Sequence, residues 1–370
     1  MESHVSMKDI AQRAGVTAAT VSMSLRGHPD IPLTTRERIG VIARAMGYRP
    51  NPLVSALMRS RRSRRPTTAR PVLAFICALE RPDAWRNAAS PTRRYIRAGA
   101  FARAAERGYE GQEFWLHRDG MSPERFSEML HARGIQGVLF SPLPDGALPP
   151  PMLWEHFAAV SLSVPLPSLT LHTVCNDHYF SSLRTVQECH RLGYRRPGLV
   201  LRESHRAYFQ GRWEAGFFTG QQSLCGVKTL GPLFLDQMDA ITAADLKRFE
   251  RWLDREKPDV VVALNWEFAE AVLKKLGRRV PVDIGLASLC RPEKKSHISG
   301  IYQDGHHIGA TAADVLISMV ERHEKGLPQH ALTTMIEGSW SPGETLRLQP
   351  AAMEKTNPPL KPARRKRSAA

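Results

Sequence analysis

Residues 5–26, VSMKDIAQRAGVTAATVSMSLR, have the pattern of two short helices joined by a tight turn at Gly15. Ser6, with Asp9 three residues later, predicts a capping box and a helix that ends near Ala14. A second helix follows directly after the turn. This arrangement is typical of a helix-turn-helix, in which the second helix lies in the major groove of DNA.

The sequence predicts that these two helices share a small core with a third. Thr17 is a good N-cap for the second helix. Thr34 with Glu37 predicts another capping box, opening a third helix that runs through Met46 and is ended by Gly47. The expected core positions, at helical spacing, are Ile10, Ala11, Ala14, Val21, Leu25, Ile39, Ile42, Ala43 and Met46.

Small side chains begin the second helix. Thr17, Ala18 and Ala19 would let it lie deep in a groove, where threonine bonds base edges or phosphates and alanine methyls contact thymine methyls. Thr20 and Ser22 are expected to bond phosphates. The alternative is an ordinary capped helix of a small bundle.

A second segment with DNA-binding chemistry follows. Asn51 and Pro52 favour the start of a short helix over 53–59, too short to be stable alone in water. Leu57 on such a helix could wedge between base steps in the minor groove, or instead pack on another part of the protein. Residues 59–70, RSRRSRRPTTAR, form a basic linker that would contact phosphates or remain solvated.

Charge is concentrated at the two ends of the chain. Residues 1–70 carry 13 Lys and Arg against 4 Asp and Glu, and 361–370 carry 5 basic and no acidic residues. Because the whole chain has a formal net charge of +16, the part between is nearly neutral. A polyanionic partner is therefore expected. The tail 351–370 is expected to be disordered, and its charge either adds nonspecific DNA affinity or is solvated.

From Val72 onward, apolar runs of strand length alternate with helical patterns, which predicts parallel sheets covered by helices on both faces. The strand-like runs are 72–79, 135–140, 158–163, 198–202, 259–264 and 283–288. The helix-like stretches are 94–107, 123–132, 179–192, 208–223, 243–256, 266–276 and 308–324.

Several function classes are disfavoured. The 5 cysteines are scattered without metal-ligand or redox spacing, so we expect reduced thiols in a cytoplasmic protein, with no metal or cofactor. The N-terminus lacks a signal peptide and no run of apolar residues could span a membrane, which argues against a secreted solute-binding module. Without a phosphate-binding glycine loop or a nucleophile elbow, an enzyme is not expected.

The chain resembles the lactose/galactose repressor (LacI/GalR) family. The headpiece match lies in VSMKDIAQRAGVTAATVSMSL, TRERI and AMGYRPNPLVSALM, and weaker matches include RLGYRRPGLVL, GRWEAGF, ALNWEFAEAVL and ISGIYQDGHHIGATAADVLI. The resemblance implies a homodimeric DNA-binding repressor, controlled by a small-molecule effector bound between two subdomains of a periplasmic-binding-protein-like domain. A palindromic operator is expected, because the two-fold symmetry of a dimer matches it.

The resemblance also implies the domain boundaries. These are a helix-turn-helix domain over 1–50, a hinge helix and basic linker over 51–70, an effector and dimerisation domain over 71–350, and the tail 351–370. The N-subdomain would comprise about 71–164 and 302–332, and the C-subdomain about 165–301 and 333–350. The chain would cross between them near 164–167, 300–302 and 332–335.

Site residues follow from the same resemblance, with Ala18 and Ala19 setting base specificity and Leu57 inserting at the operator centre. The predicted DNA-binding residues are Ser6, Thr17, Ala18, Ala19, Thr20, Ser22, Met23, Arg26, Tyr48, Asn51, Ser55, Ala56, Leu57 and Arg59. The predicted effector-binding residues are Arg212, Asn265, Trp266, Gln303 and Asp304.

Some residues depart from the family pattern. Met23 stands where arginine is common and Arg26 where asparagine is common, so the recognition of bases in the major groove should differ at these positions. Cys290 replaces a common sugar-binding aspartate, which leaves open whether the effector is a sugar. Trp266 could stack on a ring of the ligand or fill the core. Whether the effector weakens or strengthens DNA binding also stays open.

Overall fold

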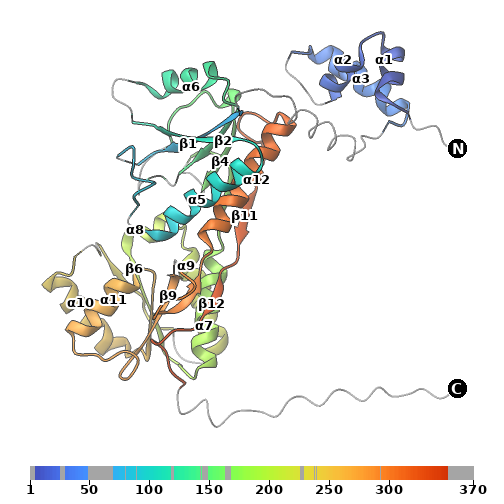
Figure 1. The fold of residues 1–370 in the computed structure, drawn as a ribbon. Helices are drawn as coiled ribbons and strands as arrows, with labels where there is room; N and C mark the ends of the chain where they lie inside the picture. Colours follow the sequence, from blue (N-terminus) through green and yellow to red (C-terminus); the bar gives the residue numbers. More distant parts are fainter. Residues whose placement is uncertain are drawn as a thin grey trace, which may run out of the picture. The chain divides into compact units, whose positions relative to one another are not determined.

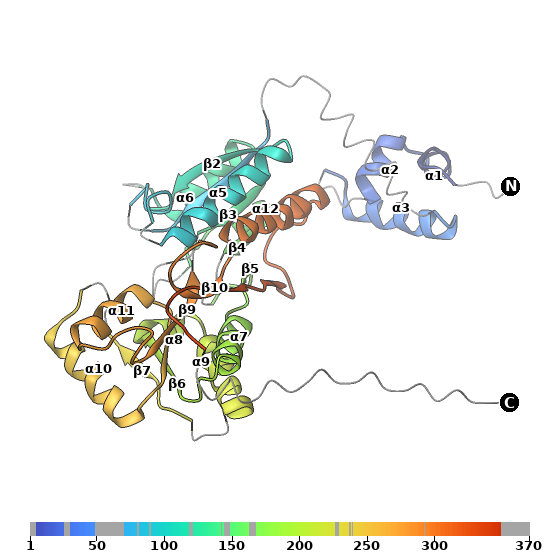
Figure 2. The same cartoon turned by 60° about the horizontal axis from the view of Figure 1, so that its bottom comes forward.

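The computed structural model describes residues 5–25, 30–48 and 70–348, with gaps at 80, 89, 118–120, 142, 144–148, 163–167, 226–228, 237, 239 and 292. The chain divides into two compact units (Figures 1 and 2). Unit 1 comprises Met1–Cys175 and Gly305–Thr334, and unit 2 comprises Asn176–Asp304 and the chain from Met335 onward. None of the described helices is both long and apolar enough to cross a membrane.

The first three helices form a headpiece, with α1 at Met7–Ala14, α2 at Ala18–Leu25 and α3 at Leu33–Ala45. Its core contains every apolar position expected from the sequence. The buried residues are Ile10, Ala11, Ala14, Val21, Ile39 and Ala43, and packed against them are Val5, Met7, Val16, Ala18, Leu25, Ile42, Met46 and Tyr48.

The start of α3 differs from the prediction. The capping box expected at Thr34 and Glu37 is wrong, because α3 begins at Leu33 after Pro32 and has no side-chain cap. Proline fixes its own φ, here −53°, and suits a helix start, where a missing N–H costs nothing. The helix therefore begins two residues earlier than predicted and places Thr34 inside its first turn.

Unit 1 contains a six-stranded sheet with strand order β11-β5-β4-β3-β1-β2. The strands β1 to β5 pair in parallel, as expected for this sheet, although the apolar runs predicted only β1, β3 and β4 among them. Their bounds are Val72–Cys77 (β1), Glu110–Trp115 (β2), Gly137–Phe140 (β3), Ala158–Leu162 (β4), His172–Asn176 (β5) and Thr333–Ile336 (β11).

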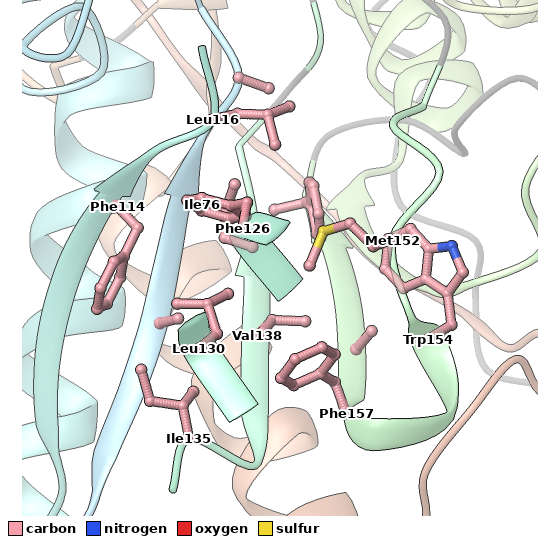
Figure 3. Packing of buried hydrophobic residues seen from close by; sticks show 14 of the residues in the cluster. Ile76, Phe114, Leu116, Phe126, Leu130, Ile135, Val138, Met152, Trp154 and Phe157 are labelled. Carbon is pink, nitrogen blue, oxygen red and sulfur yellow. The ribbon is translucent and has the colours of Figure 1, made fainter. Parts of the chain in front are cut away.

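Helices cover both faces of this sheet. On one face, α6 (Pro123–Ala132) places Phe126 and Leu130 against strand residues such as Val138 (Figure 3). On the other face, α5 (Pro91–Glu106) and α12 (Gly305–Arg322) lie side by side (Figures 1 and 2). A short 3-10 helix, η1 (Trp154–His156), precedes β4.

Unit 2 repeats the plan with strand order β12-β10-β9-β8-β6-β7. All its described pairs are parallel except β10 with β12. The strand bounds are Pro197–Arg202 (β6), Leu233–Leu235 (β7), Val260–Ala263 (β8), Gly285–Arg291 (β9), Ser299–Tyr302 (β10) and Ser339–Ser341 (β12).

The helices of unit 2 again lie on both faces of the sheet. One core joins strand residues to α7 and α9, and the other joins them to α10 and α11. The helix bounds are His178–Arg191 (α7), Glu203–Tyr208 (α8), Arg212–Gly220 (α9), Gln221–Cys225 (η2, a π-helix), Ala243–Glu256 (α10) and Trp266–Lys275 (α11). The stretch 208–223, expected as one helix, is divided at Gly211, whose φ of 67° interrupts it.

The crossings between units differ in part from the expected positions. The first was expected at 164–167, which lies outside the described residues, yet β5 beyond it still pairs with β4 in the first sheet. The chain therefore enters unit 2 only after Cys175, because the sheet of unit 1 takes one more strand than expected. The other crossings fall at 304–305 and 334–335.

Candidate nucleic-acid interface and ligand site

Local hydrogen bonds fix the position of α2 in the headpiece. The capping box at Ser6 and Asp9 starts α1, and Gly15, with φ of 66°, reverses the chain after it. The Oγ1 of Thr17 accepts a hydrogen bond from the backbone N–H of Thr20 at 3.1 Å. These three devices confirm the helix-turn-helix predicted from residues 5–26.

Burial divides α2 into two faces. Val21 is fully buried, and Ala18 and Leu25 pack against the same core. Ala19 is exposed and Met23 is half-buried, and neither belongs to the described core of the headpiece. The outward face of α2 is therefore formed by Ala19 and Met23, which lie one turn apart, while Ala18 is turned partly toward the core.

Two predicted DNA-binding residues already have contacts within the headpiece. The Oγ of Ser6 donates to the Asp9 carboxylate at 2.7 Å, and these hydrogen bonds lower the pKa of Asp9. The ring of Tyr48 packs on the core. Arg26, Asn51, Ser55, Ala56, Leu57 and Arg59 lie outside the described residues, together with the expected hinge helix 53–59.

Exposed basic side chains surround the headpiece helices. Lys8 and Arg13 lie on α1, and Arg38 and Arg44 lie on α3. Cations of this kind neutralise phosphates without reading sequence. The headpiece therefore combines a nearly apolar outward face on α2 with positive charge on its neighbours.

In unit 2, most of the predicted effector residues follow the carboxyl ends of parallel strands. Asn265 caps α11 directly after β8, Gln303 and Asp304 come after β10, and Arg212 begins α9 beyond β6 and α8. Because the carboxyl ends of parallel strands meet at one edge of a sheet, ligands of doubly wound folds bind there.

The same edge contains His178, which was not among the residues predicted to bind the effector. His178 begins α7, and its ring lies 4.8 Å from the rings of both Phe209 and Trp213. Burial, with a smaller contribution from the charge of Arg212, lowers the pKa of His178 from 6.5 to about 3. The imidazole is therefore neutral at physiological pH and can both donate and accept a hydrogen bond.

Several buried polar atoms near these residues have no hydrogen-bond partner among the residues that the structure describes. They are Asn176 Oδ1, His178 Nδ1, Ser182 Oγ, Trp213 Nε1, Glu214 Oε2 and Asn265 Oδ1. Such atoms usually have a partner in folded proteins, and an unpaired one is costly. A polar ligand at this edge would provide partners. The sequence signal was the polar run Asn176-Asp177-His178, which begins at the last residue of β5.

The other predicted effector residues have structural contacts of their own. The Nε2 of Gln303 donates to the carbonyl of Leu289 at 3.3 Å, and Gln303 is only 5% exposed. Trp266 packs partly on the core of unit 2 and meets the ring of His297 edge-on at 5.2 Å. Trp266 therefore fills part of the core, which was one of the two roles considered for it.

Arg212 lies on a more open part of unit 2. Its guanidinium donates to Gln210 Oε1 at 3.3 Å. Within the described residues, no group of three or more His, Cys, Asp or Glu side chains is placed to hold a metal ion.

Comparisons with known proteins agree with this architecture. Residues 6–51 match the model of the lacI family of bacterial regulatory proteins, and 186–340 match a periplasmic binding protein-like domain. The transcriptional repressor CytR of Escherichia coli (strain K12) is 24% identical over 346 residues, covering 88% of this chain and 92% of CytR.

Two solved structures share the fold. The regulator CelR in complex with cellobiose has a TM-score of 0.57 at 19% identity, covering 92% of this chain and 100% of CelR. The lac repressor dimer bound to operator and the anti-inducer ONPF has a TM-score of 0.52 at 18% identity, covering 93% of this chain and 99% of the lac repressor chain. The chain therefore joins a DNA-binding domain of the lacI family to a periplasmic binding protein-like domain. It is a DNA-binding transcriptional regulator and not an enzyme.

Proposed function

We propose that this regulator is a cytoplasmic homodimeric repressor that places one α2 helix in each half of a palindromic operator. The observation that carries the proposal is the exposed outward face of α2, held by the cap at Thr17 and the turn at Gly15. The lac repressor dimer, whose fold this chain shares, has been solved on its operator. A dimer with this geometry reads two half-sites related by two-fold symmetry.

Selection of bound duplexes from a random pool, at about physiological salt, tests this proposal. We expect a palindrome whose central step is flexible, since the Leu57 segment would wedge there. Replacing Leu57 with alanine should then weaken binding to the palindrome more than to nonspecific DNA. Recovery of only sequence-independent, salt-sensitive binding would contradict the proposal.

We also propose that a small-molecule effector binds at the carboxyl edge of the second sheet. Arg212 and Asn265 would contact it, and the neutral His178 with the indole N–H of Trp213 would add hydrogen-bond partners. The unpaired buried polar atoms support this assignment. The predicted location between the two subdomains stays a prediction.

The effector proposal is tested by measuring operator affinity with and without the small-molecule fraction of a bacterial extract. We expect about a tenfold change for the unaltered protein, within the usual range of allosteric coupling. Arg212→Ala should lose the response and keep the basal operator affinity, whereas Arg125→Ala, an exposed arginine of α6, should keep both. An equal response of both variants would contradict the assignment. Cellobiose, bound by CelR, is a direct probe for a sugar effector.

A further inference from the structure

The chemistry of α2 restricts how it can read DNA. Its eight residues, AATVSMSL, include no acidic and no basic side chain. They also include no asparagine or glutamine. Bases are usually read in the major groove by bidentate hydrogen bonds, from arginine or lysine to guanine and from asparagine or glutamine to adenine. Within Ala18–Leu25, none of these contacts is available.

The packing of α2 shows which side chains remain for readout. Ala18 and Val21 are turned toward the core of the headpiece. The hydroxyls of Thr17 and Thr20 lie 2.9 Å apart, so one of them donates to the other. Ala19 and Met23 lie four residues apart and therefore neighbour each other on the outward face.

The outward face is thus an apolar ridge formed by a methyl group and a thioether chain. In the major groove, the C5-methyl of thymine is the apolar group that distinguishes base edges. The exposed cations of α1 and α3 supply affinity for phosphates but no sequence information. These charges bring α2 to the DNA. The apolar ridge then gains the most binding free energy where it contacts thymine methyl groups in the groove.

We propose that Ala19 and Met23 read thymine C5-methyl groups by apolar contact, and that this contact is the main direct readout by α2. The proposal rests on the proposed DNA-binding function and names what its recognition helix selects. Each operator half-site should then contain one or two thymines whose methyl groups, rather than hydrogen-bonding groups, are required.

The decisive probe is uracil, which pairs as thymine does and lacks only the C5-methyl. After selection of the operator, each thymine is replaced singly by uracil and the affinity of the full-length protein is measured. Removing one buried methyl should weaken binding about fourfold at the one or two contacted positions and leave the others unchanged. At those positions 5-methylcytosine opposite guanine should bind more tightly than cytosine opposite guanine.

Variants of Met23 test whether this residue causes the loss of affinity at a uracil. Met23→Ala should reduce the penalty for uracil at one position, and Met23→Arg should add a preference for guanine near that position. The matched control Lys8→Ala should weaken all duplexes equally and preserve the ratio of thymine to uracil affinity. Because Met23 lies outside the described core, both of its variants should fold.

The outcomes separate this proposal from the one on which it rests. Specific binding to a selected site that tolerates uracil at every thymine overturns the methyl readout and leaves the repressor function intact. If no sequence is selected at all, both proposals are overturned. A uracil penalty that is identical in Met23→Ala and the unaltered protein excludes Met23 as the reader.

Discussion

Single hydroxyl groups at helix starts have different energetic roles in the headpiece. The Oγ of Ser6 takes part in a reciprocal cap with Asp9, while Thr34, which has the same sequence signature, lies inside α3 and caps nothing. Two residues that look equivalent in the sequence should therefore respond differently to the same substitution.

Ser6→Ala should lower the free energy of unfolding of the headpiece by about 1 kcal/mol, because the backbone N–H of Asp9 loses its acceptor, the Ser6 hydroxyl. Thr34→Ala should change it by less than about 0.5 kcal/mol. Thermal unfolding followed by circular dichroism of both variants checks this. Equal losses would mean that Thr34 caps α3 after all.

His178 should make unit 2 sensitive to acid. Its pKa in the folded state, about 3, lies below the ordinary value of 6.5 because the ring is buried. The unfolded chain therefore binds the proton first, so stability is fully present above pH 6.5 and is lost as the pH falls toward 3. His178→Phe keeps the ring packing and should reduce the loss of stability at low pH.

Urea unfolding at pH 7, 6 and 5 measures that effect. The unaltered protein should lose stability more steeply with falling pH than His178→Phe does. His306→Phe, at an exposed position of α12, serves as the control and should follow the unaltered protein. Identical slopes for all three proteins would show that His178 is not buried in neutral form.

At the scale of elements, the contact between α5 and α12 depends on glycine. A Cβ built on Gly309 would overlap the carbonyl oxygen of Ile96, and one on Gly99 would overlap that of His306. The absence of side chains at these two positions lets the helix backbones approach each other closely.

Gly309→Ala should destabilise unit 1 by about 3 kcal/mol, because backbone atoms of a packed helix must move to admit the methyl. Gly40→Ala is the matched control, since its Cβ would meet only a flexible arginine end at 3.6 Å. It should stabilise α3 by about 0.5–1 kcal/mol. Hydrogen exchange resolved by segment distinguishes the two effects. Unchanged protection of α5 and α12 in Gly309→Ala would contradict the close approach.

The elements that were predicted from sequence share strong local signals. α6 and α10 match their predicted ranges, and both begin behind a side-chain cap, at Ser122 and Thr242. Strand β2 was missed because its sequence, EGQEFW, is mostly polar and only Phe114 is buried, as suits an edge strand. Strands β7 and β12 have three residues each, too few for a periodic pattern.

The candidate sites, too, were predicted only where the signals are local in the sequence. The helix-turn-helix was predicted because its caps, turn and core lie within one short stretch of sequence. His178 and Trp213 were missed because residues 35 positions apart meet only through the packing of α7 on α9. The resemblance gave Arg212 and Asn265, whereas the buried ring cluster beside them is a product of tertiary structure.

At the scale of the whole molecule, charge is segregated by sequence region. The first 70 residues carry 13 basic and 4 acidic side chains, and 361–370 adds five more basic residues. Deleting 361–370 should weaken nonspecific DNA binding at low salt and leave the specific affinity at about physiological salt nearly unchanged. Titrations at two salt concentrations measure both. Unchanged binding at low salt would exclude a role of the tail in DNA affinity.

The order in which the ribosome releases the chain follows from the threefold crossing between the units. The sheet of unit 1 begins at β1, but α12, which covers one of its faces, is completed only at Arg322, after nearly all of unit 2 has been made. Once β5 has been made, apolar residues of that sheet face, such as Leu73, remain uncovered by α12 while the 129 residues of Asn176–Asp304 emerge. The nascent chain is therefore most prone to aggregation, and most in need of a chaperone, before α12 arrives.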